Sequence, residues 1–280
     1  MKFNRYIILF ALFFGCSVTY GQSFDDAVND LKDLMVKAAA ENDNSMKQPY
    51  IKSFSELLQK TLKQPNSLRQ SFDSVPYLKV LSSDDGVLRI FNWGAPDKDG
   101  KYTYYAIIQR RMGDKNSPLS DIYVLEDTKN DVIKPEETTL RYPDWYGCLY
   151  YEILERQDMG KTMYVLMGLD FNDNISYKKY IDILTFNPQG IPYFGAPVFI
   201  DDEEGIKSRI IFEYSAQSQM YLRYHNEVDK IVFNWLHPIH PEKKDDKSYY
   251  VADITYDGFE FKHGKWVKVR NILLKRKIQK

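Results

Sequence analysis

Residues 87–109 read VLRIFNW-GAPDKDG-KYTYYAIIQ, and this stretch decides the fold class. In the outer segments, 87–93 and 101–109, apolar and aromatic residues recur at a period close to two, as they do in half-buried β-strands. The central segment, 94–100, contains two glycines, a proline and two aspartates, which favour a turn. The stretch therefore predicts a β-hairpin.

The same period continues to about residue 272, with turn sequences such as 187–190 (NPQG) and no helical pattern between the strands. Short strands of this kind predict a mainly β (α+β) chain with an antiparallel β meander over residues 76–272. A sandwich, a barrel and propeller-like sheets stay open as alternatives, because periodicity does not distinguish them. The further strands are expected at 122–125, 148–154, 163–169, 180–186, 193–200, 209–214, 220–224, 230–236, 249–254, 259–262 and 266–272.

Residues 22–75 have a helical pattern instead. Ser23 and Asp26 resemble a capping box, and a second helix is expected after Pro49, with Ser53 and Glu56 as its candidate cap. Because an isolated amphipathic helix is marginal in water, we expect a helical hairpin docked on the β domain. The apolar faces consist of Phe24, Val28, Leu31, Leu34, Met35 and Ala38, and of Phe54, Leu57, Leu58 and Leu62.

Residues 1–21 have the organisation of a secretory signal peptide. Two basic residues precede the apolar run 6–14, which is too short to span a bilayer. Thr19 and Gly21 suit signal-peptidase cleavage, so we expect a periplasmic or secreted mature chain beginning at Gln22. Lipidation of Cys16, which would anchor the protein to a membrane, is the weaker alternative because Phe13 and Phe14 fit a lipobox poorly.

Composition excludes several classes of protein. There are 38 Lys and Arg against 39 Asp and Glu, and loss of Lys2 and Arg5 would leave 36 against 39, a net charge of −3. A nucleic-acid partner would require a basic excess, so none is expected. No later segment approaches membrane-spanning length, and no transmembrane segment is expected after signal removal. Residues 273–280 form a basic tail.

Cys148 would be the one cysteine left after signal cleavage, so the fold must depend on its core rather than on a disulfide. Its surroundings, YGCLYY at 146–151, favour a small buried hydrophobe over a catalytic thiol.

Carboxylates are the remaining candidates for catalysis. The chain contains neither a G-x-S-x-G elbow nor a phosphate-binding glycine motif, and nothing in it implies a cofactor. A glycosidase would need two carboxylates facing one cleft, which a sequence does not show. The candidates on or beside predicted strands are Asp144, Glu152, Asp182 and Glu213.

Two segments invite comparison with metal sites. His237 and His240 are closely spaced, but the prolines around them indicate an extended surface loop without a third ligand in place. Asp170, Asn172 and Asn174 alternate as the oxygen ligands of a calcium loop do. The glycine and the glutamate that an EF-hand needs are replaced by isoleucines, so an Asx-rich turn is expected and no metal is predicted at either segment.

The four tryptophans lie at strand ends or turns, where an amphipathic ring could contact a ligand. Most of them should be sheet core. Trp145, followed by Tyr146, is the expected exception because prolines and glycines keep its neighbourhood loop-like, and Trp93 is a weaker candidate for binding.

The segments IDILTF (181–186), GAPVF (195–199), RIIFEYS (209–215), MYLRY (220–224), KIVF (230–233), YDGF (256–259) and FKHGKW (261–266) stand out as a set. Together they resemble a group of exported proteins of Bacteroidetes-type bacteria that has no assigned activity, over roughly residues 76–272. The resemblance implies a location in a Gram-negative envelope and transfers no functional residue. It also implies O-glycosylation at Ser74, because such bacteria modify Asp-Ser/Thr before an apolar residue, as in DSV at 73–75.

The sequence therefore predicts an exported, non-enzymatic binding or interaction module whose partner is an envelope protein or a glycan. The alternative is a carboxylate-based hydrolase of envelope glycan.

Overall fold

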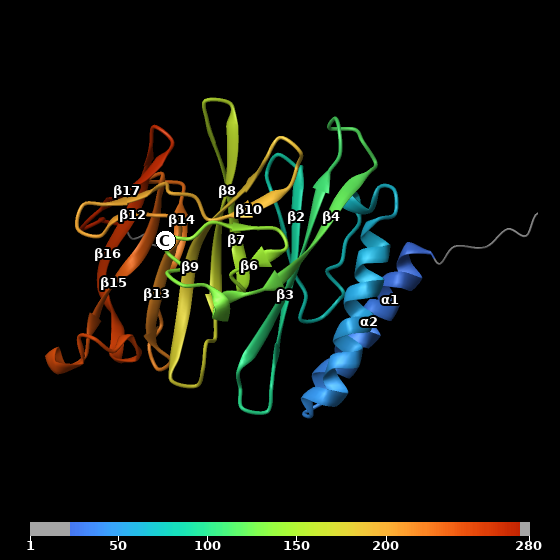
Figure 1. Cartoon of the computed structure of the whole chain (residues 1–280), viewed down its shortest axis with the longest axis horizontal. Helices are drawn as coiled ribbons and strands as arrows, with labels where there is room; N and C mark the ends of the chain where they lie inside the picture. Colours follow the sequence, from blue (N-terminus) through green and yellow to red (C-terminus); the bar gives the residue numbers. More distant parts are fainter. Residues whose placement is uncertain (1–22, 275–280) are drawn as a thin grey trace, which may run out of the picture.

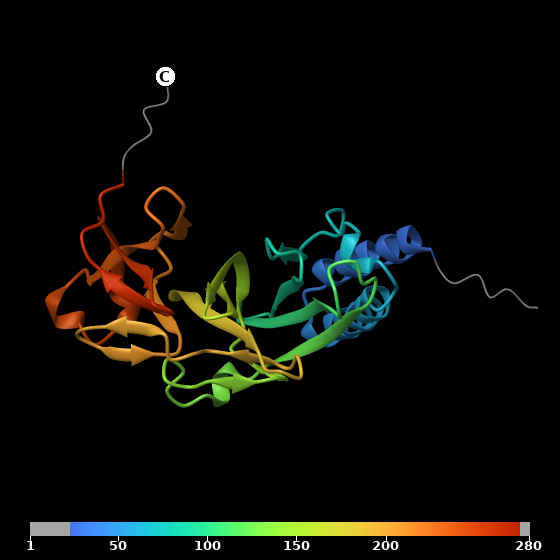
Figure 2. The same cartoon turned by 90° about the horizontal axis from the view of Figure 1, so that it is seen from above.

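The computed structural model describes residues 23–274, which form four layers in a row: a helical hairpin followed by three β-sheets (Figure 1). The mainly β fold with an N-terminal helical hairpin is therefore as predicted. The expected signal peptide with Cys16, and residues 275–280 of the basic tail, lie outside the described residues. Seen from above, the row of layers is bent rather than straight (Figure 2).

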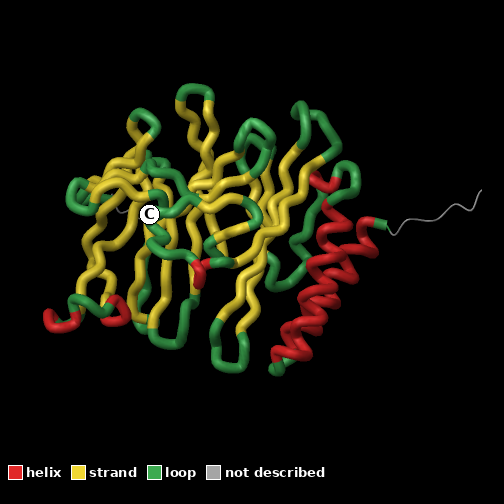
Figure 3. Tube along the Cα trace, in the orientation of Figure 1, coloured by secondary structure: helices red, strands yellow, loops and turns green. Residues whose placement is uncertain are grey.

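The two helices form one end of the row, and elsewhere only short 3₁₀ turns are helical (Figure 3). In α1 (Phe24–Ala40), the Ser23 Oγ accepts a hydrogen bond from the Asp26 N–H at 3.1 Å, as the capping box predicts. The start predicted for the second helix is wrong, because α2 (Asn44–Leu62) begins before Pro49. Asp43 caps this earlier start, and Pro49, the sixth residue of α2, removes one backbone hydrogen bond of the helix.

Sheet I contains the hairpin predicted from residues 87–109. Its strand order is β1-β2-β3-β4-β6, and β2 pairs with β3 from Leu88↔Arg110 to Pro96↔Tyr102. The short β6 joins β4 in parallel, which is one of two parallel pairings in the described residues. The strands are β1 (Lys79–Ser82), β2 (Leu88–Pro96), β3 (Tyr102–Arg111), β4 (Ser120–Asp127) and β6 (Asp144–Trp145).

Sheet II is the central layer, with the order β5-β10-β9-β8-β7. The longest strand of this sheet is β9, which pairs with β10 along its C-terminal half and with β13 along its N-terminal half. The strands are β5 (Leu140–Arg141), β7 (Leu149–Asp158), β8 (Lys161–Asp170), β9 (Ser176–Phe186), β10 (Pro192–Phe194) and β13 (Ile210–Ser215).

Sheet III has the order β12-β11-β17-β16-β15-β14. The 3₁₀ turns η3 (Pro241–Lys243) and η4 (Lys247–Tyr249) connect its two longest strands, β15 and β16. The strands are β11 (Phe199–Asp201), β12 (Gly205–Lys207), β14 (Leu222–His225), β15 (Lys230–Pro238), β16 (Tyr250–Lys262) and β17 (Lys265–Val269).

Two predicted strand boundaries are wrong. The strand expected at 193–200 is split between β10 and β11, because the chain leaves sheet II at Gly195 and enters sheet III. Gly195 has φ +83°, and a Cβ at this position would lie 2.9 Å from the Thr138 carbonyl, so the crossing requires glycine. The strands expected at 249–254 and 259–262 form the single strand β16, which bulges opposite Trp235.

Three apolar clusters join the four layers. One lies between the helices and sheet I, where the Phe54 and Trp93 rings meet edge to face at 5.0 Å. The second lies between sheets I and II, and the third between sheets II and III. Of the predicted alternatives, the described residues form stacked open sheets, and none closes on itself as a barrel. Among the described helices, neither is long and apolar enough to cross a membrane.

The helical hairpin should contribute to the stability of the whole molecule. Phe54→Ala removes a fully buried ring that contacts Trp93, so we expect a loss of about 3–5 kcal/mol in the free energy of unfolding by urea, followed by circular dichroism. The matched control is Met46→Ala, because this side chain is exposed on the same helix. Equal effects of the two substitutions would show that the hairpin is dispensable to the core.

Candidate binding cleft

A cleft of about 690 Å³ lies between sheets II and III. It is lined by the segment 134–137, by β13, by residues 233–236 of β15, and by residues from β16 and η4. These segments are distant in sequence, and they meet because the chain crosses between the two sheets more than once. A cleft of this size suits a small ligand or a short stretch of a larger partner.

Aromatic side chains form one wall of the cleft. The Phe212 and Phe233 rings lie 4.6 Å apart and join β13 to β15. Trp235 is 49% exposed, and one face of its indole is stacked on the His237 ring, with centroids 5.5 Å apart. The His237 ring covers one face of the indole, and the exposed part of the indole is an apolar contact surface in the cleft.

The charged side chains around the cleft are largely neutralised by one another. Burial would lower the pKa of Lys207, but the hydrogen bonds that Lys207 donates to the Glu204 and Glu136 carboxylates more than offset this, and the pKa is raised. Lys247 instead places its Nζ 3.9 Å from the centroid of the Tyr250 ring. The cleft therefore offers little uncompensated charge to a ligand. Its ion pairs are Lys207 with Glu136 at 2.9 Å and with Glu204, Lys268–Asp201 at 2.7 Å, Lys134–Glu137 at 3.1 Å and Lys178–Glu213 at 3.7 Å.

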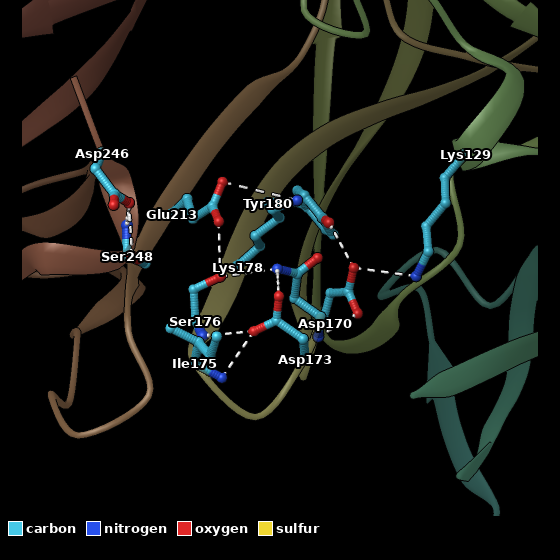
Figure 4. Close-up of polar contacts among 11 residues, drawn as sticks. Lys129, Asp170, Asp173, Ile175, Ser176, Lys178, Tyr180, Glu213, Asp246 and Ser248 are labelled. Carbon is cyan, nitrogen blue, oxygen red and sulfur yellow. Dashed lines mark hydrogen bonds and ion pairs between the residues drawn. The ribbon is translucent and has the colours of Figure 1, made fainter. Parts of the chain in front are cut away.

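Glu213 connects the cleft to the β8–β9 turn (Figure 4). Its carboxylate accepts a hydrogen bond from Ser176 Oγ at 2.6 Å, and Asn172 Nδ2 donates to the same Oγ at 2.8 Å. Asp173 Oδ1 accepts from the Ile175 and Ser176 N–H groups, which closes the turn. Residues 170–176 therefore form an Asx-rich turn.

Asp170 is engaged by protein groups. Its Oδ1 accepts from the Asn172 N–H at 2.8 Å, and its Oδ2 accepts from Lys129 Nζ at 3.0 Å and from the Tyr180 hydroxyl at 2.9 Å (Figure 4). The surface loop expected around His237 is wrong for that residue, which lies in strand β15 with its ring stacked on Trp235, whereas His240 is exposed just before η3. Within residues 23–274, no group of three or more His, Cys, Asp or Glu side chains is placed to hold a metal ion.

Asp182 and Arg209 form a fully buried ion pair behind the cleft, with Asp182 Oδ2 2.9 Å from Arg209 Nε. Burial would lower the pKa of the Arg209 guanidinium, but the charge of Asp182 outweighs it and the pKa is raised. Tyr150 donates to the same carboxylate at 3.3 Å, and Arg209 Nη1 donates to the Pro135 carbonyl at 2.9 Å. The pair therefore joins β9 and the residue immediately before β13 to the segment 134–137 that lines the cleft.

The four candidate catalytic carboxylates lie in different surroundings. Of these, Glu213 lines the cleft and Asp182 is in the buried ion pair. Asp144 is exposed and borders a second hollow of about 470 Å³.

Glu152 belongs to a separate polar cluster beside β14. Its Oε1 accepts from the Tyr224 N–H at 3.2 Å, and burial raises its pKa. Lys179 donates to the Met220 carbonyl at 2.6 Å, and burial, with a smaller effect of Arg223, lowers its pKa to about 8. Local sequence does not identify Lys179, since a single lysine in a strand carries no signal of its burial.

The prediction that Trp145 is exposed is wrong. Its side chain is fully buried between sheets I and II, and its indole N–H donates to the Tyr150 hydroxyl at 3.0 Å. The loop around it passes between two sheets instead of over the surface, which local sequence does not reveal. Trp93 is likewise buried under the helices, so neither ring can contact a ligand directly. Tyr146 is 9% exposed and lines the cleft.

Cys148 and Ser74 are the remaining candidates from the sequence. Cys148 is buried, as predicted, and burial raises the pKa of its thiol well above its usual value. Ser74 is exposed in a turn between the buried Phe72 and Val75, so it stays an accessible candidate for O-glycosylation. Comparison with protein-family models, with curated protein sequences and with solved structures finds no match for this chain.

The buried ion pair should dominate the stability of the wall behind the cleft. Asp182→Asn leaves the Arg209 charge buried without a counter-ion, so we expect a loss of about 3–5 kcal/mol in the free energy of unfolding at neutral pH. Asp144→Asn is the control, because the same chemical change at an exposed carboxylate should stay within about 0.5 kcal/mol. Indistinguishable urea midpoints for the two variants would contradict this role of the pair.

Proposed function

We propose that this protein is an exported binding module of the cell envelope, and that it binds its partner in the cleft between sheets II and III. Export is inferred from the signal-peptide pattern of residues 1–21. The partner is an envelope protein or a glycan.

The observation that carries the proposal is the position of Trp235. The other three tryptophans are at most 1% exposed, whereas Trp235 is 49% exposed on the wall of a cleft and is held by His237. Leaving so large an apolar surface in water has a free-energy cost, and tryptophan is among the residues that contribute most to binding. A binding role accounts for this exposure.

The chemistry of the cleft supports binding rather than hydrolysis. A glycosidase mechanism needs a second carboxylate at a defined distance from the first. Of the four candidates from the sequence, Glu213 lines the cleft, and there it is engaged by Ser176 and Lys178. Asp144, Glu152 and Asp182 belong to other surroundings. The further carboxylates of the cleft are engaged by protein groups: Glu136, Glu137, Glu204 and Asp201 are paired with lysines, and Asp257 accepts from the Asn271 N–H.

The proposal is tested by affinity capture from solubilised native envelope and from its glycan fraction, with wild-type protein and Trp235→Ala as baits. We expect the variant to lose at least about tenfold in captured partner, because an aromatic anchor is removed. Ile254→Ala is the matched control, since Ile254 is 89% exposed in the same sheet and does not line the cleft. Equal capture by wild type and Trp235→Ala would place the binding site elsewhere and refute the proposal.

A further inference from the structure

One edge of β13 carries no neighbouring strand. β13 pairs with β9 in antiparallel register, from Ile210↔Ile181 to Ser215↔Ser176, and with no other strand among the described residues. In an antiparallel ladder, alternate residues direct both backbone polar groups toward the partner, and the residues between them direct both away from it. Half of the backbone groups of β13 must therefore point away from sheet II.

The register identifies those groups. The N–H groups of Ala216 and Gly195 bond to the carbonyls of Ile175 and Ile183. The odd-numbered residues of β9 and its flanks therefore direct their backbone groups toward β13 and β10. It follows that the even-numbered residues of β13 bond to β9. Ile211, Glu213 and Ser215 direct their backbone N–H and C=O groups to the free edge.

Hydrogen bonds along this edge agree with the assignment. The Ile211 N–H donates to Glu136 Oε1 at 3.1 Å, so a carboxylate oxygen occupies the place that a carbonyl of a further strand would take. The Ser215 carbonyl accepts from the Ser218 N–H at 2.9 Å. Between these two points, within the described residues, no hydrogen bond engages the outward N–H or C=O of Glu213. Directional donors and acceptors thus stay available on the side of β13 that faces the cleft.

The cleft lies directly beyond this edge. Four successive residues of β13, 210–213, line it, which requires the cleft to be next to the edge and not only above one face of the strand. On one side of the edge are Phe212 and the aromatic wall with Trp235. On the other side are Tyr146 and the Lys178–Glu213 ion pair.

We propose that the cleft binds an extended peptide segment of the partner, which adds to the free edge of β13 as a further strand of sheet II. This inference rests on the proposed function, because it takes the cleft to be the binding site. Main-chain hydrogen bonds to Glu213 would give affinity, and side-chain pockets would give specificity. Alternate peptide side chains would be apolar, toward Phe212 and Trp235, and polar, toward Lys178.

The paired charges of the cleft disfavour an anionic partner. Four of the five lysines in the lining are already paired with carboxylates, so a polyanionic glycan or a phosphate-rich surface gains little there. A near-neutral peptide suits a cleft whose charges are already paired, and its main chain can bond to the outward backbone groups of β13. A neutral glycan could stack on Trp235, but it would not need the outward backbone donor and acceptor of Glu213.

The test begins with a phage-displayed library of random dodecapeptides selected on the full mature chain. The enriched peptide is synthesised, and its affinity for Glu213→Pro and Glu213→Ala is measured by fluorescence anisotropy. Both variants lack the carboxylate, but only Glu213→Pro lacks the outward N–H. The bonds from β13 to β9 use even-numbered residues, and proline is tolerated on an edge strand. We expect binding at least about tenfold weaker for Glu213→Pro than for Glu213→Ala.

A second measurement uses the wild-type protein alone and so does not depend on the folding of Glu213→Pro. The peptide is N-methylated at one position after another and titrated against the wild-type protein. A peptide bound as a strand should lose affinity at every second position and tolerate methylation at the positions between. A pattern without this alternation would overturn the proposal.

The outcomes separate this inference from the proposed function. Peptides that bind Glu213→Pro and Glu213→Ala equally would contact side chains alone, so strand addition would be wrong. If no peptide is enriched while Trp235→Ala still loses the envelope partner, the cleft binds another class of ligand and only this inference fails. If no peptide is enriched and Trp235→Ala captures the partner normally, both fail.

Discussion

β9 is packed on both faces, and the arrangement of the other layers depends on this. Tyr180 and Leu184 pack toward sheet I, whereas Ile181 and Ile183 pack toward sheet III. A strand with two buried faces has no place for an unpaired charge, because burying one costs several kcal/mol. Asp182 on this strand is accordingly paired with Arg209 inside the core. Sheet II therefore needs apolar packing partners on both of its faces.

The cleft follows from the way the chain completes this central sheet. β10 covers one half of β9, and the chain then leaves for sheet III before it returns as β13 on the other half. The returning strand is paired along one edge only, and its other edge faces the space between sheets II and III. The buried ion pair fixes β13 to β9 and to the segment 134–137, so the same interaction that satisfies the core also shapes the cleft wall.

Local pattern was enough to predict the fold class, and it failed where tertiary contacts decide. The hairpin at 87–109 and the cap at Ser23 are formed by residues close in sequence, so period and capping chemistry identify them. The split of residues 193–200 is decided by contacts of Gly195 with distant residues, and the burial of Trp145 by two sheets. The cleft itself joins segments near residues 135, 212 and 235, which no local signal connects. Trp235 lies opposite a bulge in the neighbouring strand, and its exposure was not predicted for the same reason.

Because sheet II is packed against both neighbouring sheets, all three sheets should open together. Native-state hydrogen exchange tests this most directly. We expect the slowest amides of β3, β9 and β15 to share one opening free energy, equal to that of global unfolding, since each sheet buries its face against a neighbour. Exchange of the β15 amides at a clearly lower free energy than those of β9 would show that sheet III opens on its own and would contradict the account.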